Sequence, residues 1–441
     1  MQNELNGEGM QRVAVVYDLG AASAVDIVTA LEGFAVPIFV CPDSGHEEYP
    51  FEIMSEFGIL CDVRGLDVDE AVLRLRNLRP AGITTFTDYQ LDFTARLAAA
   101  LGLPFHTSET VEALTRKYVQ RGLLNSCGAS HVATRLIRDE SSLRSAFAEL
   151  GGPGVVKPDV GTGSRNTYRI VDACDVEQFS FHHFADGAKW QSPEPFVLER
   201  EIPCAVQDGP WGDYVSVESL ILGDRIEHLG ICGKFPLAKP YRETGSCFPA
   251  ALSPTDVAEV TDLVTGAIRA LGVRHGICHT EVKFSATGLQ VIEVNGRLGG
   301  RVNELVRQTG GPSVIEIAAR LALSDDSAFT MAREWAPQGV SFLYAKVPPY
   351  EATRLLDIRG VDDLHDLTGI SRAITQQEPG AVIDWRRGRL EHAYICFGMA
   401  SSHEGVLHLV SEIEGTVSVT YEVVHSDAVE PEIYQKQEVE R

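Results

Sequence analysis

The chain has 441 residues, 44% of them apolar and 23% charged, which is enough for two or three globular domains with substantial cores. Its formal net charge of −24 argues against non-specific binding to nucleic acid or to anionic membrane surfaces. The sequence has no run of about 18 apolar residues that could cross a membrane, and its polar N-terminus does not resemble a signal peptide. Nine scattered cysteines without a C-x-x-C pair indicate reduced thiols in a cytoplasmic protein.

The N-terminal part alternates short strands and helices, which predicts a parallel sheet with helices on both faces. The expected strands are Arg12–Tyr17, Val36–Val40 and Gly82–Phe86, and the expected helices are Ala22–Leu31, Glu47–Phe57, Asp69–Leu78 and Tyr89–Leu101. The first strand–helix turn, Asp18-Leu19-Gly20, lacks the G-x-G-x-x-G pattern. A dinucleotide site at that turn is therefore not expected.

From about Lys117 onward the pattern changes to longer strands and hairpins. Antiparallel strands are expected at Gly154–Pro158, Tyr168–Val171, Phe196–Glu199, Tyr214–Glu218 and Arg225–Ile231, and helices at Asp256–Leu271 and Pro312–Leu323. Beyond about Gln338, short strands are expected at Val340–Val347, Ile370–Gln376, Tyr394–Phe397 and Val417–Val424. These patterns predict an N-terminal α/β domain over 11–112, a central region over 113–335 with a small lid at about 125–200, and a β-rich C-terminal domain over 336–430.

Lys157 ends a buried strand and is followed by a loop, Gly161-Thr162-Gly163-Ser164. Such a lysine can pair with phosphate while backbone N–H groups of the loop approach the phosphate oxygens. The order of residues is not that of a Walker A loop. A glycine hairpin beside a surface lysine is an equally common structure, so this segment alone leaves both interpretations open.

The segments His279–Phe284 and Leu289–Asn295 both alternate apolar and polar residues and predict a β-hairpin. A three-residue turn at residues 286–288 would place Glu281 opposite Glu293, whereas a two-residue turn would shift the pairing and point the two carboxylates to opposite faces. In the first register the two Cβ atoms lie about 5 Å apart, and the carboxylates repel unless a cation lies between them. Mg²⁺ prefers oxygen ligands of this kind. The alternative is a solvated face with incidental acids, and Arg297, just beyond the second strand, counts against it.

These features stand in an order that resembles the ATP-grasp carboxylate–amine ligases. In chain order they are Lys117, Lys157 with the Gly161–Ser164 loop, Glu199 and Glu201, Tyr214–Glu218, His279-Thr280-Glu281, and Glu293-Val294-Asn295-Gly296-Arg297-Leu298-Gly299-Gly300. The resemblance covers about residues 11–330 and is strongest to bacterial L-amino-acid (dipeptide) ligases. It implies the ATP-grasp fold, of mixed α/β and α+β class. A biotin carboxylase is less similar, because the residues after Arg297 do not follow its pattern.

The resemblance also implies roles for individual residues. Lys117 and Lys157 would contact the ATP phosphates under a loop formed by Gly161, Gly163 and Ser164, and Lys157 and Arg297 would be catalytic. Glu199 and Glu201 would lie at the adenine and ribose, with Asp213 as an alternative ribose ligand. Glu281, Glu293 and Asn295 would hold Mg²⁺, as one or two ions, with Mn²⁺ as a substitute.

The implied reaction joins a small-molecule carboxylate to an amine through an acyl phosphate, in a cytoplasmic homodimer that binds neither nucleic acid nor membrane. A thiol or hydroxyl acceptor, an intramolecular cyclisation, or a nucleotide-binding protein without ligase activity are alternatives that the nucleotide motifs do not separate. Residues Lys234–Pro249 are a candidate acceptor-facing loop, or equally an ordinary surface connection. The C-terminal domain could support the lid, wall the pocket or form a dimer contact.

Overall fold

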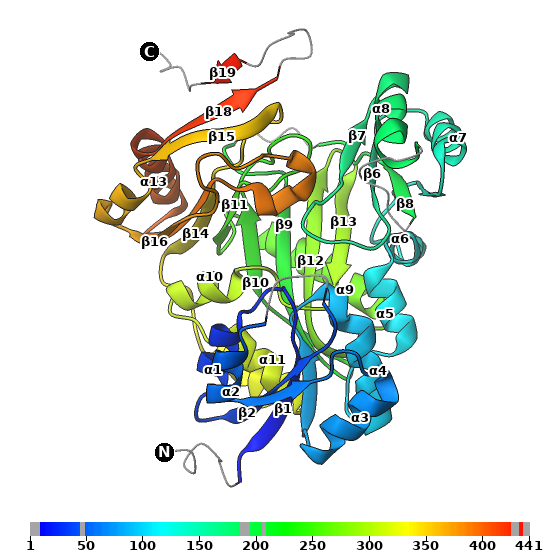
Figure 1. The fold of residues 1–441 in the computed structure, drawn as a ribbon, viewed down its shortest axis with the longest axis vertical. Coiled ribbons are helices and arrows are strands. Elements are labelled where there is room, and N and C mark those ends of the chain that lie inside the picture. The colour runs from blue at the N-terminus through cyan, green and yellow to red at the C-terminus, as the bar shows by residue number, and fades with distance from the viewer. Residues whose placement is uncertain (1–8, 45–48, 186–194, 205–208, 425–431, 435–441) are drawn as a thin grey trace.

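The computed structural model describes residues 9–44, 49–185, 195–204, 209–424 and 432–434. Residues 1–8, on which the expectation about a signal peptide rests, and residues 47–48 of the expected helix Glu47–Phe57 lie outside these ranges. Figure 1 shows the N-terminal domain at one end, with the lid and the C-terminal elements side by side at the other. Among the described helices, none combines the length and apolar character needed to cross a membrane. All nine cysteines are free, as expected for reduced thiols.

The N-terminal domain is a four-stranded parallel sheet in the order β3-β2-β1-β4. Helices α1 and α11 pack on one face of the sheet and α3 and α4 on the other, as the alternation of strands and helices predicts. Its elements are β1 (Gln11–Val16), α1 (Ala24–Leu31), β2 (Ala35–Cys41), α2 (Phe51–Phe57), β3 (Ile59–Asp62), α3 (Val68–Asn77), β4 (Gly82–Thr85), η1 (Asp88–Gln90) and α4 (Leu91–Leu101). Strand β3 was not expected from the sequence, because its four residues are too short to show a period.

The lid is a four-stranded antiparallel sheet in the order β5-β8-β6-β7, covered by α7 and α8. Two helices connect it to the N-terminal domain. These elements are α5 (Ser108–Thr115), α6 (Lys117–Ser126), β5 (Thr134–Ile137), α7 (Glu140–Leu150), β6 (Gly154–Pro158), β7 (Tyr168–Ile170), α8 (Ala173–His183) and β8 (Phe196–Arg200). The sheet falls within the range of 125–200 expected for the lid.

An eight-stranded sheet in the order β13-β12-β9-β10-β11-β14-β17-β16 runs through the rest of the molecule. Helix α9 packs on one face, and α10, α11 and α12 pack with the N-terminal domain on the other. These elements are β9 (Tyr214–Leu222), β10 (Arg225–Lys234), β11 (Gly245–Phe248), α9 (Pro254–Ala270), β12 (His275–Ser285), β13 (Gly288–Asn295), α10 (Val302–Gln308), α11 (Val314–Ala322), α12 (Ser327–Arg333), β14 (Val340–Ala345), β16 (Ile370–Thr375) and β17 (Tyr394–Ala400). Strands from beyond residue 336 therefore extend the sheet that carries the hairpin.

The remaining C-terminal elements pack around a second small sheet, β15-β18-β19. They are β15 (Ala352–Arg359), η2 (Asp362–Asp366), η3 (Trp385–Glu391), α13 (His403–Thr416), β18 (Ser418–Val423) and β19 (Glu432–Tyr434). Because β14, β16 and β17 pair with the central sheet, the C-terminal domain expected over 336–430 shares a sheet with the central region. The domain limits themselves remain predictions.

The hairpin β12–β13 departs from the expected register near its turn and agrees with it at the site. The turn has two residues, because Ser285 pairs with Gly288, so the expected three-residue loop is wrong. A β-bulge then intervenes: Val282 pairs with Val291, but the next pair is Glu281 with Glu293, and Ile292 is the extra residue. A bulge adds one residue to one strand and so changes the face that later side chains occupy. It restores the pairing of the two glutamates that the two-residue turn would otherwise separate.

Candidate active site

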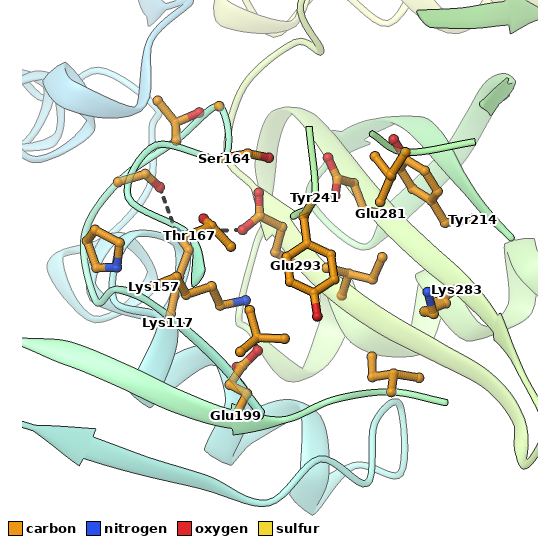
Figure 2. Close-up of a pocket in the computed structure, with 18 of the residues that line it drawn as sticks. Lys117, Lys157, Ser164, Thr167, Glu199, Tyr214, Tyr241, Glu281, Lys283 and Glu293 are labelled. Carbon is orange, nitrogen blue, oxygen red and sulfur yellow. Dashed lines mark hydrogen bonds and ion pairs between the residues drawn. The ribbon is translucent and has the colours of Figure 1, made fainter. Parts of the chain in front are cut away.

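A cavity of about 1110 Å³, part of it open to solvent, lies between the hairpin β12–β13 and the lid. Its lid side is formed by β6, β8 and the loop that contains Gly161, Gly163 and Ser164. Its floor includes Glu281, Lys283, Ile292 and Glu293. Figure 2 shows Lys117 and Lys157 opposite Glu281 and Glu293. The hairpin face is therefore the wall of a cavity.

Two lysines reach the cavity from different elements. Lys157 lies on β6, and its Nζ is 2.8 Å from Oε2 of Glu199. Lys117 is the first residue of α6; its Nζ donates a hydrogen bond of 2.6 Å to the carbonyl of Gly161 and lies 3.6 Å from Oε2 of Glu293. The structure thus brings both predicted lysines to one cavity, between the glycine loop and the acidic floor.

Asp159 fixes the position of Lys117, which the sequence did not indicate. Its carboxylate accepts a hydrogen bond of 2.8 Å from the backbone N–H of Tyr118 and pairs with Arg116 at 3.1 Å, while its carbonyl accepts from the N–H of Lys117. A carboxylate at the start of a helix satisfies N–H groups that have no partner within the helix. The glycine loop and the first turn of α6 are therefore held together.

Glu199 lies on the cavity wall, but both of its oxygens already have cationic partners. Arg121 lies 2.9 Å from Oε1, and Lys157 lies at Oε2. Burial opposes ionisation, but Arg121 and Lys157 prevail and lower the pKa of Glu199 to about 2. This geometry suits a residue that supports Lys157, and contact with adenine or ribose remains a prediction for Glu199.

Glu201 and Asp213 are the alternative ribose ligands that the resemblance implies. Glu201 lies on the cavity wall, where it pairs with Arg169 at 2.8 Å and accepts a hydrogen bond of 2.8 Å from the hydroxyl of Tyr241. Asp213 pairs with Lys283 at 2.7 Å and is not one of the residues that line the cavity. The positions favour Glu201 for the ribose, which still stays a prediction.

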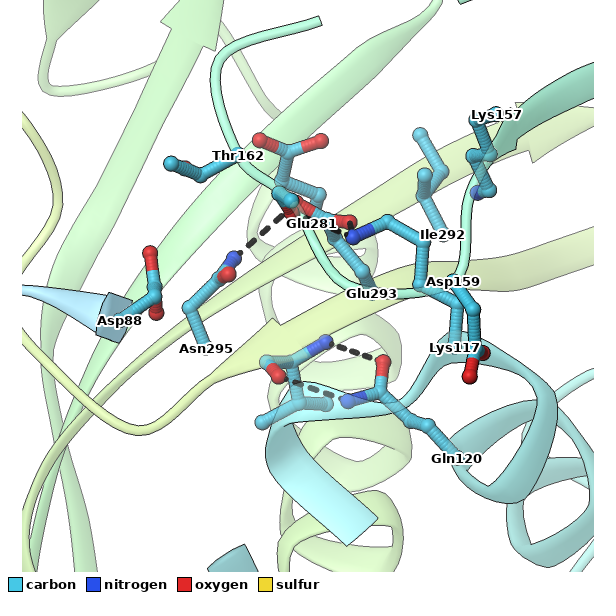
Figure 3. Close-up of polar contacts among 12 residues, drawn as sticks. Asp88, Lys117, Gln120, Lys157, Asp159, Thr162, Glu281, Ile292, Glu293 and Asn295 are labelled. Carbon is cyan, nitrogen blue, oxygen red and sulfur yellow. Dashed lines mark hydrogen bonds and ion pairs between the residues drawn. The ribbon is translucent and has the colours of Figure 1, made fainter. Parts of the chain in front are cut away.

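Glu281 and Glu293 line the large cavity, and Asn295 lies beside Glu293 in a smaller adjoining pocket (Figure 3). Asn295 donates through Nδ2 to Oε1 of Glu293 at 3.2 Å, and its own Oδ1 is not used in that bond. Burial would raise the pKa of Glu293, but Lys117 and Lys157 lower it to about 2, so this carboxylate is ionised. Within the described ranges no three His, Cys, Asp or Glu side chains form a metal cluster. Two carboxylates and an amide fit Mg²⁺ that takes its further oxygens from phosphate.

His279 is held between two acids next to this group. Its Nδ1 contacts Glu218, and its Nε2 lies 3.6 Å from Oε1 of Glu281. Burial disfavours the imidazolium, but Glu218 and Glu281 raise the pKa of His279 to about 9. The other oxygen of Glu218 accepts from the N–H of Gly299 at 3.0 Å. The H-x-E motif is thus tied to the Gly299-Gly300 turn by a buried chain of hydrogen bonds.

Arg297 connects three parts of the molecule. Its Nε and Nη2 lie 2.8 and 2.7 Å from Oδ2 of Asp88 in the N-terminal domain, and Nη2 donates to Oγ1 of Thr162 in the glycine loop at 3.2 Å. Asp88 was missed in the sequence, although it closely follows β4, and ligands in α/β sheets bind near the carboxyl ends of the strands. The position of Asp88 shortly after β4 was the signal in the sequence that could have identified it.

The Lys234–Pro249 segment contributes Leu237, Tyr241 and Glu243 to the cavity wall. Lys234 is 7% exposed and pairs with Glu243 at 2.9 Å. The segment is therefore part of the cavity wall. Whether it faces an acceptor remains a prediction.

The chain is similar in sequence to known proteins over part of its length. No family model matches it. It is 27% identical to the uncharacterized protein y4rH of Sinorhizobium fredii over 247 residues, which are 56% of this chain and 49% of that protein. It is 25% identical to carnosine synthase 1 of Mus musculus over 239 residues (52% and 29%) and 23% identical to alanine–anticapsin ligase of Bacillus subtilis over 231 residues (49% and 48%). The chain therefore spans half or less of the length of these relatives.

Among solved structures, the L-amino acid ligase from Bacillus licheniformis superposes with a TM-score of 0.69 at 20% identity, covering 93% of this chain and 98% of that one. The N5-carboxyaminoimidazole ribonucleotide synthetase from Thermotoga maritima gives a TM-score of 0.66 at 14% identity, covering 93% and 99%. Likeness over nearly the whole chain at such low identity concerns the fold. It confirms the fold class that the order of motifs implied.

Proposed function

We propose, from its membership of the ATP-grasp proteins near the amino-acid ligases, that this chain is an ADP-forming ligase that joins a carboxylate to an amine. The observation that supports this most directly is the pairing of Glu281 with Glu293 on the cavity floor, opposite Lys117 and Lys157. Cations on one wall and oxygen ligands on the other suit a nucleotide triphosphate with its metal ion.

The chemical difficulty is that a carboxylate is a poor electrophile with a poor leaving group. Transfer of the γ-phosphoryl group of ATP to a carboxylate oxygen forms an acyl phosphate and releases ADP. The amine then attacks the carbonyl carbon, and the tetrahedral intermediate expels phosphate to leave an amide. Phosphoryl transfer needs alignment and charge neutralisation more than covalent help from the protein.

The residues of the cavity can provide that alignment. Lys117 and Lys157 hold the phosphates, and Glu199 keeps Lys157 extended towards them. Glu281, Glu293 and Asn295 would hold Mg²⁺, which when bound neutralises charge on the transferred group. The role of the loop at Gly161–Ser164 is to cover the phosphates with backbone N–H groups.

Arg297 is the proposed partner of the reacting carboxylate and of the group transferred to it. Its planar guanidinium can form two parallel hydrogen bonds to a carboxylate or phosphoryl group. In the present structure Asp88 and Thr162 orient it from two sides. A substrate carboxylate would therefore meet a guanidinium that is already positioned.

The substrates are proposed from the names of the similar proteins. An L-amino acid ligase, a carnosine synthase and an alanine–anticapsin ligase point to amino acids or related acids as the carboxylate and to an amino acid as the amine. We also propose a cytoplasmic homodimer that binds neither nucleic acid nor membrane, that uses one or two Mg²⁺ ions, and that accepts Mn²⁺ in their place.

A screen of phosphate release tests the function. The protein is incubated with Mg²⁺-ATP and amino acids in pairs, and products are identified by mass. The proposal predicts stoichiometric ADP, phosphate and an amide that appear only when a suitable pair is present. ATP binding without turnover for any pair would point to a nucleotide-binding protein, and an ester, thioester or cyclised product would point to another acceptor.

A further inference from the structure

A segment of the C-terminal elements touches the glycine loop. The backbone N–H of Arg389, in η3, donates to the carbonyl of Gly163 at 3.4 Å, and the N–H of Asn166 donates to the carbonyl of Arg386 at 2.8 Å. Gly388, with φ of 62°, packs so closely that a Cβ there would lie 2.2 Å from the oxygen of Gly163. This contact fixes the backbone of Arg389 beside the loop.

The guanidinium of Arg389 reaches from the loop towards the turn after Arg297. A Cβ at Gly163 would lie 3.2 Å from its Nε, and a Cβ at Gly300 would lie 2.9 Å from its Nη1. Gly300 follows Arg297 by three residues. Glycines on both sides thus leave room for the side chain, and its charged end lies beside the motif that contains Arg297.

This guanidinium has no acceptor of its own within the described ranges. Arg297 is bonded to Asp88 and Thr162, whereas no ion pair or side-chain hydrogen bond of Arg389 is found among the described residues. Burial and, after it, the charge of Arg297 lower the pKa of Arg389, while Glu243, Asp88 and Tyr89 act in the opposite direction without forming a hydrogen bond or ion pair with it. A partly desolvated cation beside a second cation is unfavourable unless an anion joins them. The donors of the Arg389 guanidinium are therefore open to an anion.

The ligation reaction supplies an anion other than the nucleotide. Arg389, like Arg297, is not one of the residues that line the large cavity, where Lys117 and Lys157 would face the phosphates. Ligation of two amino acids brings in two carboxylates, and only the donor carboxylate becomes an acyl phosphate. The carboxylate of the acceptor stays ionised throughout, and a guanidinium fits it with two parallel hydrogen bonds.

We infer that Arg389 binds the α-carboxylate of the acceptor amino acid, so that the C-terminal domain supplies the residue that distinguishes an amino-acid acceptor from a simple amine. This inference rests on the proposed ligase function. Arg297 remains with the donor carboxylate, and Arg389, beside it, orients the acceptor so that its amino group faces the acyl phosphate. The C-terminal domain then forms part of the substrate site.

The test separates the two half-reactions in the full-length protein. Hydroxylamine traps an acyl phosphate as a hydroxamate with release of phosphate, so activation of the donor is measured without an acceptor. Ligation is measured with the acceptor amino acid found in the screen and with the amine that lacks its carboxylate. The variants are Arg389→Gln, Arg389→Lys and, as a matched control on the same segment, Arg387→Gln, whose side chain is 49% exposed and pairs with Glu391.

Loss of a charged bidentate contact weakens binding by about 30- to 100-fold. We expect Arg389→Gln to raise KM for the amino-acid acceptor by about that factor, with hydroxamate formation within threefold of wild type. Arg389→Lys, which keeps the charge but not the two parallel donors, should give a KM between those of wild type and Arg389→Gln. The KM of Arg387→Gln should match that of wild type. The wild-type protein should prefer the amino acid to the decarboxylated amine by a similar factor, which requires no variant.

Two results would overturn the inference. One is an equal fall in hydroxamate formation and ligation in Arg389→Gln, which would place Arg389 in phosphoryl transfer. The other is equal use of the amine and the amino acid by the wild-type protein. Failure of the ligase function itself looks different, because the wild-type protein would then form no hydroxamate with any carboxylate.

Discussion

Replacement of Glu199 by Gln probes the buried charges beneath the cavity. The side chains of Arg121, Lys157 and Glu199 are only 3%, 11% and 7% exposed. Glutamine has nearly the same shape but no charge, so the variant removes the carboxylate that the two buried cations share. This change tests whether Glu199 is the support of Lys157.

The expected loss of unfolding free energy follows from the hydrogen-bond acceptors that Arg121 and Lys157 retain in the variant. Arg121 still donates to Oγ of Ser130 and to the carbonyls of Val291 and Ile292, whereas Lys157 loses the carboxylate. Removal of one partner from a buried ion pair costs about 3–5 kcal/mol. Because Arg121 keeps three acceptors, we expect the lower end, about 3 kcal/mol of unfolding free energy for the nucleotide-free protein.

The pairing of Glu199 with Arg121 and Lys157 also makes the free energy of unfolding depend on pH. The pKa of Glu199 in the folded protein, about 2, lies below its ordinary value of 4.5. Its contribution is therefore complete above the unfolded pKa and is lost as the pH falls towards 2. Between pH 7 and pH 4 the difference between wild type and variant should narrow by roughly 1 kcal/mol.

Urea denaturation, followed by tryptophan fluorescence and far-UV circular dichroism, measures the loss. Glu149→Gln is the control, because Glu149 is 53% exposed and pairs with an exposed arginine of the lid, and it should change stability by less than about 1 kcal/mol. At one fixed ATP concentration the Glu199→Gln variant should gain more stability than wild type, because a phosphate replaces the missing anion beside Lys157. A loss below about 1 kcal/mol, or equal ATP stabilisation of both proteins, would refute the assigned role.

Three further variants test other parts of the site. Arg297→Lys should lower kcat by at least about 100-fold, because a point charge does not reproduce the fork; turnover near wild type in a folded variant would remove Arg297 from the chemistry. Glu293→Gln should lower kcat by at least about 100-fold and raise the Mg²⁺ concentration needed for half-maximal rate, and an unchanged Mg²⁺ titration would contradict its role as a ligand. Gly388→Ala should lower the free energy of unfolding in urea by about 1–3 kcal/mol, because the added Cβ would meet the Gly163 carbonyl. A urea midpoint equal to that of wild type would show that η3 does not hold the loop in place.

The hairpin shows how a prediction from sequence can reach the right pairing by an incorrect route. Alternation of apolar and polar residues fixed both strands, and the pairing of Glu281 with Glu293 is confirmed. The turn length was wrong, and the bulge at Ile292 compensates for it. A bulge depends on the neighbouring strands and on contacts such as that of Arg121 with the carbonyl of Ile292, which one strand alone does not reveal.

The local pattern of the sequence determined the fold class, because strand and helix periods are short-range and the motifs stand in a fixed order along the chain. It also identified the residues on the cavity wall, from Lys117 to Glu293. The tertiary structure decided which charges are partnered and which are available. Glu199 is neutralised by Arg121, Arg297 is oriented by Asp88, and Arg389 joins the site from more than 90 residues beyond Arg297. Ion pairs and close contacts depend on distances between elements that are remote in the chain, and only the packed fold sets those distances.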